Sequence, residues 1–491
     1  MNTIKLYLFL ALSLIIIYPS FSQTEMSVFT ATGRGGVATT FVDDYQSIGI
    51  NPSNLGWSPE LEGKKIAFSI LEGGGSLFTQ ALTRRDLLKS LAGFGSTTFT
   101  RQEKMDAAVS FTSKDFAANL DLSLFAFSLK TEKAGGFAFS IRDRVNWFSN
   151  FNQTASEIMF LGKLAPYFET LQLTDGSTIA NTPANTNGIP DADIAFGFTN
   201  SPTKFSAIFE GSKIAFSWMR EFNVSYGITL IKNETYDISF GAGAKYLQGI
   251  ATMKLSATNG VLEAQTAISP GFGIDYGVAA STNPSALPSS SSFPPKGVGA
   301  GVGFDVGISA VMNEKLKIGF AINDIGSITW TGNVYQGADN DLANLASGGF
   351  DSFNFFSQAQ NITGANGVMQ WSGEKESTDK LPTVARFGSS YLISEKIEVG
   401  ADMVLPLNDA PSNFERPMIG LGGDFKVAPM LTLSSGFNTG GNYGFNIPMG
   451  VTVGIAKNVW EVGIATRDVI TYFTKDRPMV SASFGFLRFR L

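Results

Sequence analysis

Side chains that could bind a metal recur at short spacing in one segment of the chain. The run Asn-Thr-Asn-Gly-Ile-Pro-Asp-Ala-Asp contains Asn185, Asn187, Asp191 and Asp193. Calcium is a hard cation that prefers carboxylate and amide oxygens, so this run is a weak calcium candidate. The alternative is a polar external loop that binds no metal. We expect no cofactor elsewhere in the chain.

Two residue types that carry much of enzyme chemistry are missing. The chain of 491 residues contains no His (His 0) and no Cys (Cys 0). Without imidazole or thiol there is no Ser-His-Asp relay, no Cys-His pair and no imidazole metal ligand. The formal net charge of -6 gives no electrostatic case for a nucleic-acid partner. We therefore expect a protein that is not an enzyme.

The most specific segment runs from Gly33 to Trp57. Its glycines permit tight turns and a close approach to other backbone, and an Asn-Pro pair presets a turn. Two adjacent carboxylates in a confined place need hydrogen bonds or a cation. Arginines such as Arg386 or Arg467 would supply that cation, and a bound metal ion is the alternative. The residues that we single out are Gly35, Gly36, Asp43, Asp44, Asn51, Pro52 and Leu55.

The first residues have the features of an export signal. Lys5 precedes an apolar run from Leu6 to Ile17, and small residues precede Gln23. Such a run is too short to span about 30 Å of hydrocarbon, and no Cys follows it for lipid attachment. We predict a signal peptide over 1–22, cleaved before Gln23.

The composition of the remaining chain points to a membrane barrel. It combines 53 Gly and 42 Phe with only 16% charged residues, whereas soluble domains carry about 25%. No later stretch is long and apolar enough for a helical span. A closed barrel can still cross a membrane, because closure pairs every backbone group. Alternating lipid-facing apolar and lumen-facing small or polar residues produce this composition.

Alternation and turn spacing support the same fold. Leu316, Ile318 and Phe320 alternate with polar or small residues, as strand residues do. Short turns and long connections also alternate strictly, which is typical of barrels with short periplasmic turns and long external loops. We predict an all-β, transmembrane antiparallel β-barrel of about 14 strands, with the apolar run Ile66 to Leu71 left over. The alternative is that this run is itself a barrel strand and that two of the first predicted strands are miscounted. The predicted strands lie near 104–112, 116–129, 135–148, 212–231, 235–250, 297–311, 315–330, 381–393, 396–406, 416–427, 430–438, 445–457, 459–468 and 478–491.

Two segments break the strand pattern. Residues 76–91 and 156–171 look amphipathic and predict short helices over a barrel mouth, with a functional lid as the alternative. Trp147, Trp330 and Trp460 fall at the ends of predicted strands. We therefore predict that these three are membrane-interface aromatics.

The segment that holds the Gly-Gly and Asp-Asp pairs resembles the long-chain fatty-acid outer-membrane channel family (FadL-like). It also resembles the Bacteroidota barrel relatives of that family, which include type IX secretion shuttle-like proteins. Their mature chains begin with a Gly-Gly pair, an Asp-Asp pair and Asn-Pro-Ala-Gly-Leu at similar spacing. Asn51, Pro52 and Leu55 match directly, while Ser53 replaces Ala and Asn54 replaces Gly. The resemblance implies that this segment folds inside the barrel as a plug.

These observations divide the chain into three parts. We predict a signal peptide (1–22), an N-terminal plug (23–62) and an outer-membrane barrel (63–491) with large external insertions at about 149–211 and 331–380. The resemblance implies a channel or carrier for hydrophobic small molecules, opened by plug movement or through the wall. The alternative is a barrel subunit of a secretion or surface-attachment complex, because long loops are where partners dock. The expected partners are outer-membrane lipid and either a hydrophobic small molecule or a secretion or surface protein.

Overall fold

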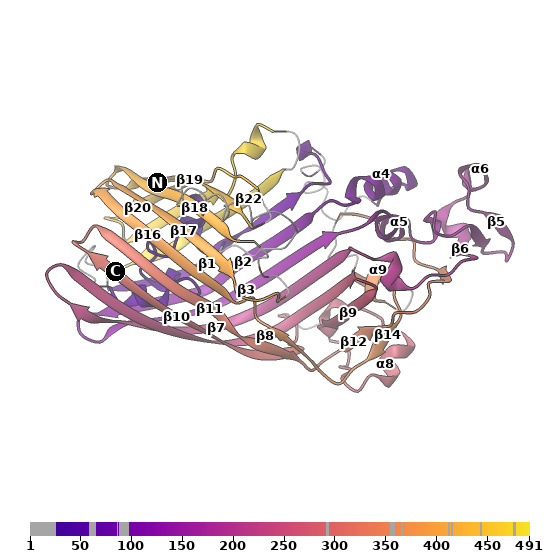
Figure 1. Cartoon of the computed structure of the whole chain (residues 1–491), viewed down its shortest axis with the longest axis horizontal. Helices are drawn as coiled ribbons and strands as arrows, with labels where there is room; N and C mark the ends of the chain where they lie inside the picture. Colours follow the sequence, from indigo (N-terminus) through magenta and orange to yellow (C-terminus); the bar gives the residue numbers. More distant parts are fainter. Residues whose placement is uncertain are drawn as a thin grey trace, which may run out of the picture.

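The strands of the computed structural model lie side by side in one continuous ring (Figure 1). The structure describes residues 26–57, 65–85, 87, 98–290, 294–353, 359–364, 367–410, 413, 416–441, 444–474 and 478–491. Neighbouring strands of the ring are antiparallel, and pairing of the last strand with the first closes it. Within these residues the barrel has 14 strands, as the sequence predicted. In ring order they are β1 (Ile66–Thr79), β2 (Phe116–Thr131), β3 (Gly135–Asn150), β7 (Lys213–Lys232), β8 (Tyr236–Thr258), β10 (Gly299–Met312), β11 (Leu316–Trp330), β16 (Val384–Ser394), β17 (Ile397–Pro406), β18 (Met418–Ala428), β19 (Leu431–Gly440), β20 (Met449–Ile455), β21 (Trp460–Thr466) and β22 (Met479–Arg490).

The two faces of the wall differ in chemistry, and β10 shows the pattern. Val302, Phe304 and Ile308 are about half exposed on its outer face. Asp305 and Ser309 are buried on the other face, which is turned to the lumen. Successive side chains of a strand point to opposite faces, so one sequence pattern produces a lipid-facing surface and a polar interior.

Connections of two lengths separate the two ends of the barrel. Residues 132–134, 233–235, 313–315, 395–396, 429–430 and 456–459 form short turns at one end. At the other end the connections are long, and they carry the remaining elements (Figure 1). These elements are α4 (Arg101–Phe111), α5 (Gln153–Leu161), η4 (Gly162–Leu164), β4 (Thr170–Leu173), β5 (Thr178–Ala180), α6 (Pro183–Thr186), η5 (Asp191–Asp193), β6 (Ile194–Phe198), α7 (Phe205–Ile208), β9 (Val261–Ile268), η6 (Pro270–Phe272), α8 (Val278–Thr282), β12 (Val334–Gly337), β13 (Asn344–Leu345), α9 (Ala359–Thr363), β14 (Trp371–Gly373), β15 (Ser377–Lys380) and η7 (Ile470–Tyr472).

The strand prediction was wrong at the N-terminal end of the barrel. The predicted strand at 104–112 is helix α4, whose start is fixed by a capping box between Thr100 and Glu103. The run that was left over, Ile66 to Leu71, is the beginning of β1. The two errors cancel, so the strand count is unchanged.

The helix predictions were also displaced. The predicted helix at 76–91 begins inside β1, because hydrogen bonding to β2 and β22 on both sides extends that strand to Thr79; residues 86 and 88–91 lie outside the described residues. The predicted helix at 156–171 is α5, which ends at Leu161 because Gly162 adopts a positive φ of 58°. The signal peptide predicted over 1–22 lies outside the described residues.

The prediction of membrane-interface aromatics was wrong for two of the three tryptophans. Trp147 is 2% exposed and belongs to the large apolar cluster between the barrel and the long connections. Trp330 is 1% exposed and donates its indole N–H to Asp379. Segments of the long connections contact both side chains, which strand position alone did not indicate. Trp460 is 37% exposed and stacks on Phe489, and its membrane role stays a prediction.

A second sheet stands beyond the barrel mouth, in the order β13-β6-β4-β5 (Figure 1). Helices α4 and α5 pack against each other between this sheet and the barrel. Lys104 of α4 bonds the Gly348 carbonyl at 2.7 Å and the Asp351 carboxylate at 2.8 Å, which ties two long connections together. No helix within the described ranges is both long and apolar enough to cross a membrane.

Candidate functional site

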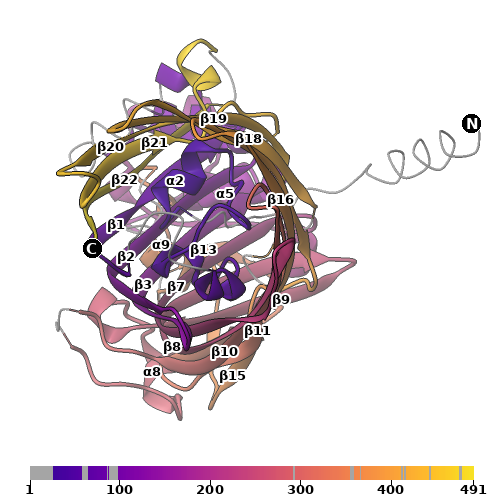
Figure 2. The ribbon, with the colours of Figure 1, turned by 90° about the vertical axis from the view of Figure 1, so that its left-hand side faces the viewer.

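Residues 26–57, here called the N-terminal segment, lie inside the ring of strands (Figure 2). The segment folds into three short turns of helix, α2 (Phe29–Gly33), η1 (Tyr45–Ser47) and η2 (Pro52–Gly56). Gly35 and Gly36 have φ angles of 77° and 81°, so they make the turn after α2 that a residue with a side chain resists. Asp44 and Asn51 each accept a backbone N–H as the N-caps of η1 and η2.

The N-terminal segment lies against every strand of the ring, and glycines in the wall make room for it. A side-chain carbon added at Gly241 of β8 would lie 2.3 Å from the Pro52 carbonyl carbon. At Gly307 of β10 it would lie 2.1 Å from the Asn51 side-chain oxygen. Other wall glycines at which an added side-chain carbon would come close to the N-terminal segment are Gly136, Gly227, Gly319, Gly388, Gly400, Gly420, Gly422, Gly450, Gly463 and Gly485. Much of the glycine in this sequence therefore serves close contact between segment and wall.

One wall carboxylate holds the turn after α2. Oδ2 of Asp402, on β17, accepts the backbone N–H of Ala38 at 2.9 Å and that of Thr39 at 2.8 Å. The Thr39 hydroxyl donates to the same oxygen at 2.7 Å. Asp402 is 3% exposed, so these charge-assisted bonds replace the water that this carboxylate would otherwise bind.

A second attachment uses an arginine of the segment. The Arg34 guanidinium donates to Asp424 of β18 at 2.8 Å and to the Val37 carbonyl at 3.1 Å. Its guanidinium carbon also lies 4.5 Å from the centre of the Phe41 ring. Arg34 is 4% exposed, so it is locked between the segment and the wall.

The Asp-Asp pair meets two strands of the wall. Arg488 of β22 donates to Asp44 at 2.7 Å and to the Tyr45 hydroxyl at 3.0 Å. The Tyr45 hydroxyl donates in turn to Glu72 of β1 at 2.6 Å, and the Gln46 amide donates to the other oxygen of Glu72 at 2.6 Å. This network ties η1 to the two strands that close the barrel.

Asp43 lies nearer the short-turn end of the lumen. Its carboxylate is 3.6 Å from the Lys130 ammonium and 3.5 Å from Arg490. Burial by itself would raise the pKa of Asp43, but Lys130, Arg490 and Arg488 outweigh it and hold that pKa well below its usual range.

The cations observed beside the two carboxylates are Lys130 of β2 and Arg488 and Arg490 of β22. The predicted partners were Arg386 and Arg467, and only the fold shows which strands supply the neighbouring cations. No group of three or more acidic side chains that could hold a metal occurs within the described ranges. The cations that face Asp43 and Asp44 are side chains of the wall.

The Asn-Pro turn is held mainly by hydrogen bonds inside the segment. Asn51 accepts the backbone N–H and the hydroxyl of Ser53. Asn54 donates to the carbonyls of Thr39 and Val42 at 2.9 and 2.7 Å. Asn54, which stands where the fatty-acid channel family has Gly, therefore adds two hydrogen bonds within the segment. Leu55 is buried in an apolar cluster that includes Tyr45 and wall alanines.

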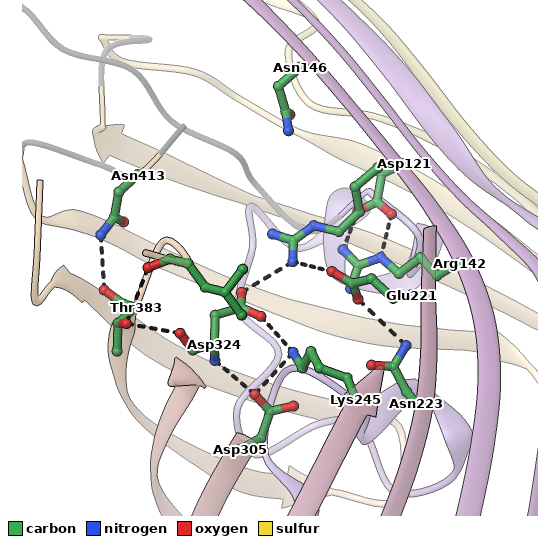
Figure 3. A network of polar contacts seen from close by, with 12 residues as sticks. Asp121, Arg142, Asn146, Glu221, Asn223, Lys245, Asp305, Asp324, Thr383 and Asn413 are labelled. Carbon is green, nitrogen blue, oxygen red and sulfur yellow. Dashed lines mark hydrogen bonds and ion pairs between the residues drawn. The ribbon is translucent and has the colours of Figure 1, made fainter. Parts of the chain in front are cut away.

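A charged network in the lumen was not predicted from the sequence (Figure 3). Arg142 of β3 forms a two-pronged ion pair with Asp121 of β2, which also accepts the backbone N–H of Met26. Arg144 and Lys245 link three further carboxylates. The signal was present as charged residues inside predicted strands, such as Asp121, Arg142 and Arg144, but their partners lie on other strands.

The weak calcium candidate lies in the long connection between β3 and β7, at α6 and η5. Arg101 of α4 donates to the carbonyls of Thr186 and Ile189 and to the Asp191 carboxylate. Asn185 donates its side-chain amide to the Ala180 carbonyl. The other members of the candidate, Asn187 and Asp193, follow at the ends of these two turns. A guanidinium thus gathers oxygens of this loop, and calcium binding here stays a prediction without support from the fold.

Comparison with known proteins places the chain in a family. The model of a family of unknown function (DUF5723) matches residues 70–460, and no curated protein matches. Solved structures with similar folds include the P. putida toluene transporter TodX, at 10% identity and a TM-score of 0.40, over 95% of this chain and 96% of that one. They also include a Pseudomonas aeruginosa FadL homologue, at 10% identity and a TM-score of 0.39, over 96% and 98% of the two chains. A TodX mutant, described as a monoaromatic hydrocarbon channel, matches at 10% identity and a TM-score of 0.44, over 96% and 98%. Because the family model covers most of its length, the chain belongs to the DUF5723 family.

Proposed function

We propose that the protein is an outer-membrane channel for hydrophobic small molecules and that the N-terminal segment is its plug. One observation carries the proposal: the segment lies inside the ring and against every strand of it. Its attachments are ion pairs and hydrogen bonds as well as apolar contacts. Such contacts can be exchanged for water, so the segment can leave the wall without unfolding the strand ladder.

Apolar side chains on the lumen face support a hydrophobic solute. Phe78, Ala117 and Phe148 lie side by side on β1, β2 and β3, and Met479 of β22 continues the row. Phe148 is four residues from Arg144 on one strand, so both face the lumen. This row lies at the end with the long connections, which is the external end. Barrel interiors are usually polar, so an apolar row at the mouth favours entry of an apolar solute.

The wall offers such a solute a sideways route near the closing strands. The ladder between β1 and β2 skips Leu71 and Leu124, and the ladder between β1 and β22 is interrupted at the same level. On the inside, the Phe29 ring lies over Gly463 and Gly485. On the outside, Leu71 and Phe486 are each 48% exposed. Movement of Phe29 with the plug would uncover a thin part of the wall.

The test is to delete residues 26–57 and measure conductance in planar lipid bilayers. We expect a folded barrel, because the strand ladder closes without the segment, and a large rise in conductance. Folding is checked by strand-dominated circular dichroism and heat-modifiable migration on gels. A folded barrel whose conductance equals that of the full chain would refute the plug.

A specific observation favours the second candidate, a barrel that acts through protein contacts. The sheet β13-β6-β4-β5 projects beyond the mouth, and among the described residues β5 is the strand at its edge (Figure 1). The purified barrel separates the two functions. A co-purified apolar small molecule supports the channel, and a stoichiometric co-purified protein supports the contact role.

A further inference from the structure

A single arginine joins two parts of the wall that are far apart in the sheet. Nη1 of Arg144, on β3, lies 2.7 Å from Glu221 of β7 and 3.1 Å from Asp324 of β11. In the ring, β7, β8 and β10 separate β3 from β11. The Arg144 side chain therefore runs along a chord of the lumen and not along the wall. Figure 3 shows its partners Glu221 and Asp324.

The backbone of β11 is shaped to bring Asp324 inward. Asp324 has a positive φ of 59°, and the ladder to β10 shifts register at this level. A bulge re-aims a side chain, and Asp is among the residues that tolerate positive φ. The Asp324 N–H donates to Asp305 at 2.8 Å, and the Thr383 hydroxyl donates to the Asp324 carbonyl at 2.9 Å. This conformation is therefore held on one side by Asp305 of β10 and on the other by Thr383, which directly precedes β16.

Lys245 of β8 pairs with the Asp324 end of the chord. The Lys245 ammonium lies 2.6 Å from Asp324 and 3.1 Å from Asp305. The side chains of Arg144, Glu221 and Lys245 are 5%, 2% and 1% exposed. Removing one partner from such a buried network leaves an uncompensated charge, so the groups hold one another in place. All the bonds described here for the chord join residues of the wall.

We propose that the chord from Arg144 to Asp324, here called the brace, is a second constriction of the lumen. It rests on the proposed channel function and adds its own selectivity. Once the plug has moved, water and small ions pass beside the brace. An apolar solute cannot pass the brace, because it would remove water from the charged groups without offering them a polar partner, at a high free-energy cost. Hydrophobic solutes must then leave through the wall, while the axial path serves only small polar species.

The experiment compares the brace with and without the plug. The double variant Arg144→Ser with Glu221→Ser removes the bridge. It deletes one positive and one negative charge together, and Asp324 keeps its ion pair with Lys245. The double variant is made in the full chain and in the barrel that lacks residues 26–57, and single-channel conductance is measured for all four proteins. We expect no change in the full chain. In the barrel without the plug we expect a conductance above that of the deletion alone, and faster permeation of large uncharged sugars.

The matched control is the pair Asp143 and Arg220. It joins the same two strands at 2.7 Å but faces away from the lumen, one residue out of step with Arg144 and Glu221. Asp143→Ser with Arg220→Ser should leave the conductance of the plug-deleted barrel unchanged. If the first double variant fails to fold, Arg144→Ala with Asp324→Ala removes the same bridge from the other side.

The outcomes separate this inference from the proposed function. If the deletion raises conductance and the brace variant adds nothing to it, the brace is not a constriction and the plug stands. If the deletion changes nothing but the brace variant opens the full chain, the plug is refuted and the brace is the barrier. If neither change has an effect, both proposals are overturned.

Discussion

Thr39 of the N-terminal segment donates twice to a single oxygen of Asp402 on β17, from its backbone nitrogen at 2.8 Å and from its hydroxyl at 2.7 Å. Ala38 donates to the same oxygen. A backbone turn of the segment is thus attached to one wall carboxylate. A single substitution at Asp402 therefore removes all three hydrogen bonds.

We predict that Asp402→Ala loosens the plug. The substitution leaves two buried backbone N–H groups without an acceptor, at a cost of about 1–3 kcal/mol for each. Channel openings in planar bilayers should become more frequent, and protease should cut the segment faster. Asp402→Asn keeps an acceptor oxygen, so its opening frequency and its cleavage rate should lie between those of the unchanged protein and those of Asp402→Ala. Asp237→Ala, at a partly exposed carboxylate on β8, is the control and should behave as the unchanged protein.

The wall glycines give a steric test of the same contact. Gly241→Ala places a methyl group 2.3 Å from the Pro52 carbonyl carbon, so η2 must move away from β8. We expect a folded barrel with raised conductance. Gly75→Ala on β1 is the control, because its methyl group would lie 3.2 Å from the nearest atom, a backbone oxygen of β2. Equal conductance of the two variants would contradict a tight fit of segment and wall.

The plug should loosen in acid through Asp43. Lys130, Arg490 and Arg488 outweigh burial and hold the pKa of Asp43 well below its usual range. A carboxyl whose pKa is depressed on docking contributes stability above its undocked pKa and loses it as pH falls through the docked value. Conductance should therefore be constant near neutral pH and rise as pH falls below about 4. Asp43→Asn should raise conductance at neutral pH and weaken the acid response, whereas an unchanged acid response would assign it to other groups.

Cysteine labelling tests which end of the barrel faces the medium. The natural chain has no cysteine (Cys 0), so each introduced thiol is unique. Ser201→Cys and Ser281→Cys, exposed in long connections, should react with an impermeant reagent on intact cells. Ser394→Cys and Asn458→Cys, exposed at short turns, should not. Labelling of the second pair alone would invert the proposed orientation.

The pattern of the sequence predicted every barrel strand but the first. From β2 to β22 each barrel strand was predicted near its observed position, because alternation and short turns are local signals. The first barrel strand was left outside the predicted set, since its Gly-rich centre weakens the alternation and its length is set by β2 and β22. Helix α4 was predicted as a strand because its capping box, Thr100 with Glu103, was overlooked.

The sequence by itself determined the barrel class and the alternation of short and long connections. The spacing of the N-terminal segment and its resemblance to the fatty-acid channel family together singled out Gly35, Gly36, Asp43, Asp44, Asn51, Pro52 and Leu55. Only the tertiary structure decided their partners, because Asp44 meets Arg488 across 444 positions of the chain. It also decided that Arg144 and Asp324 meet in the lumen. Closure of the ring brings side chains of strands that are distant in the sequence into contact, and no local pattern indicates these contacts. The ion pairs of the lumen form between such side chains.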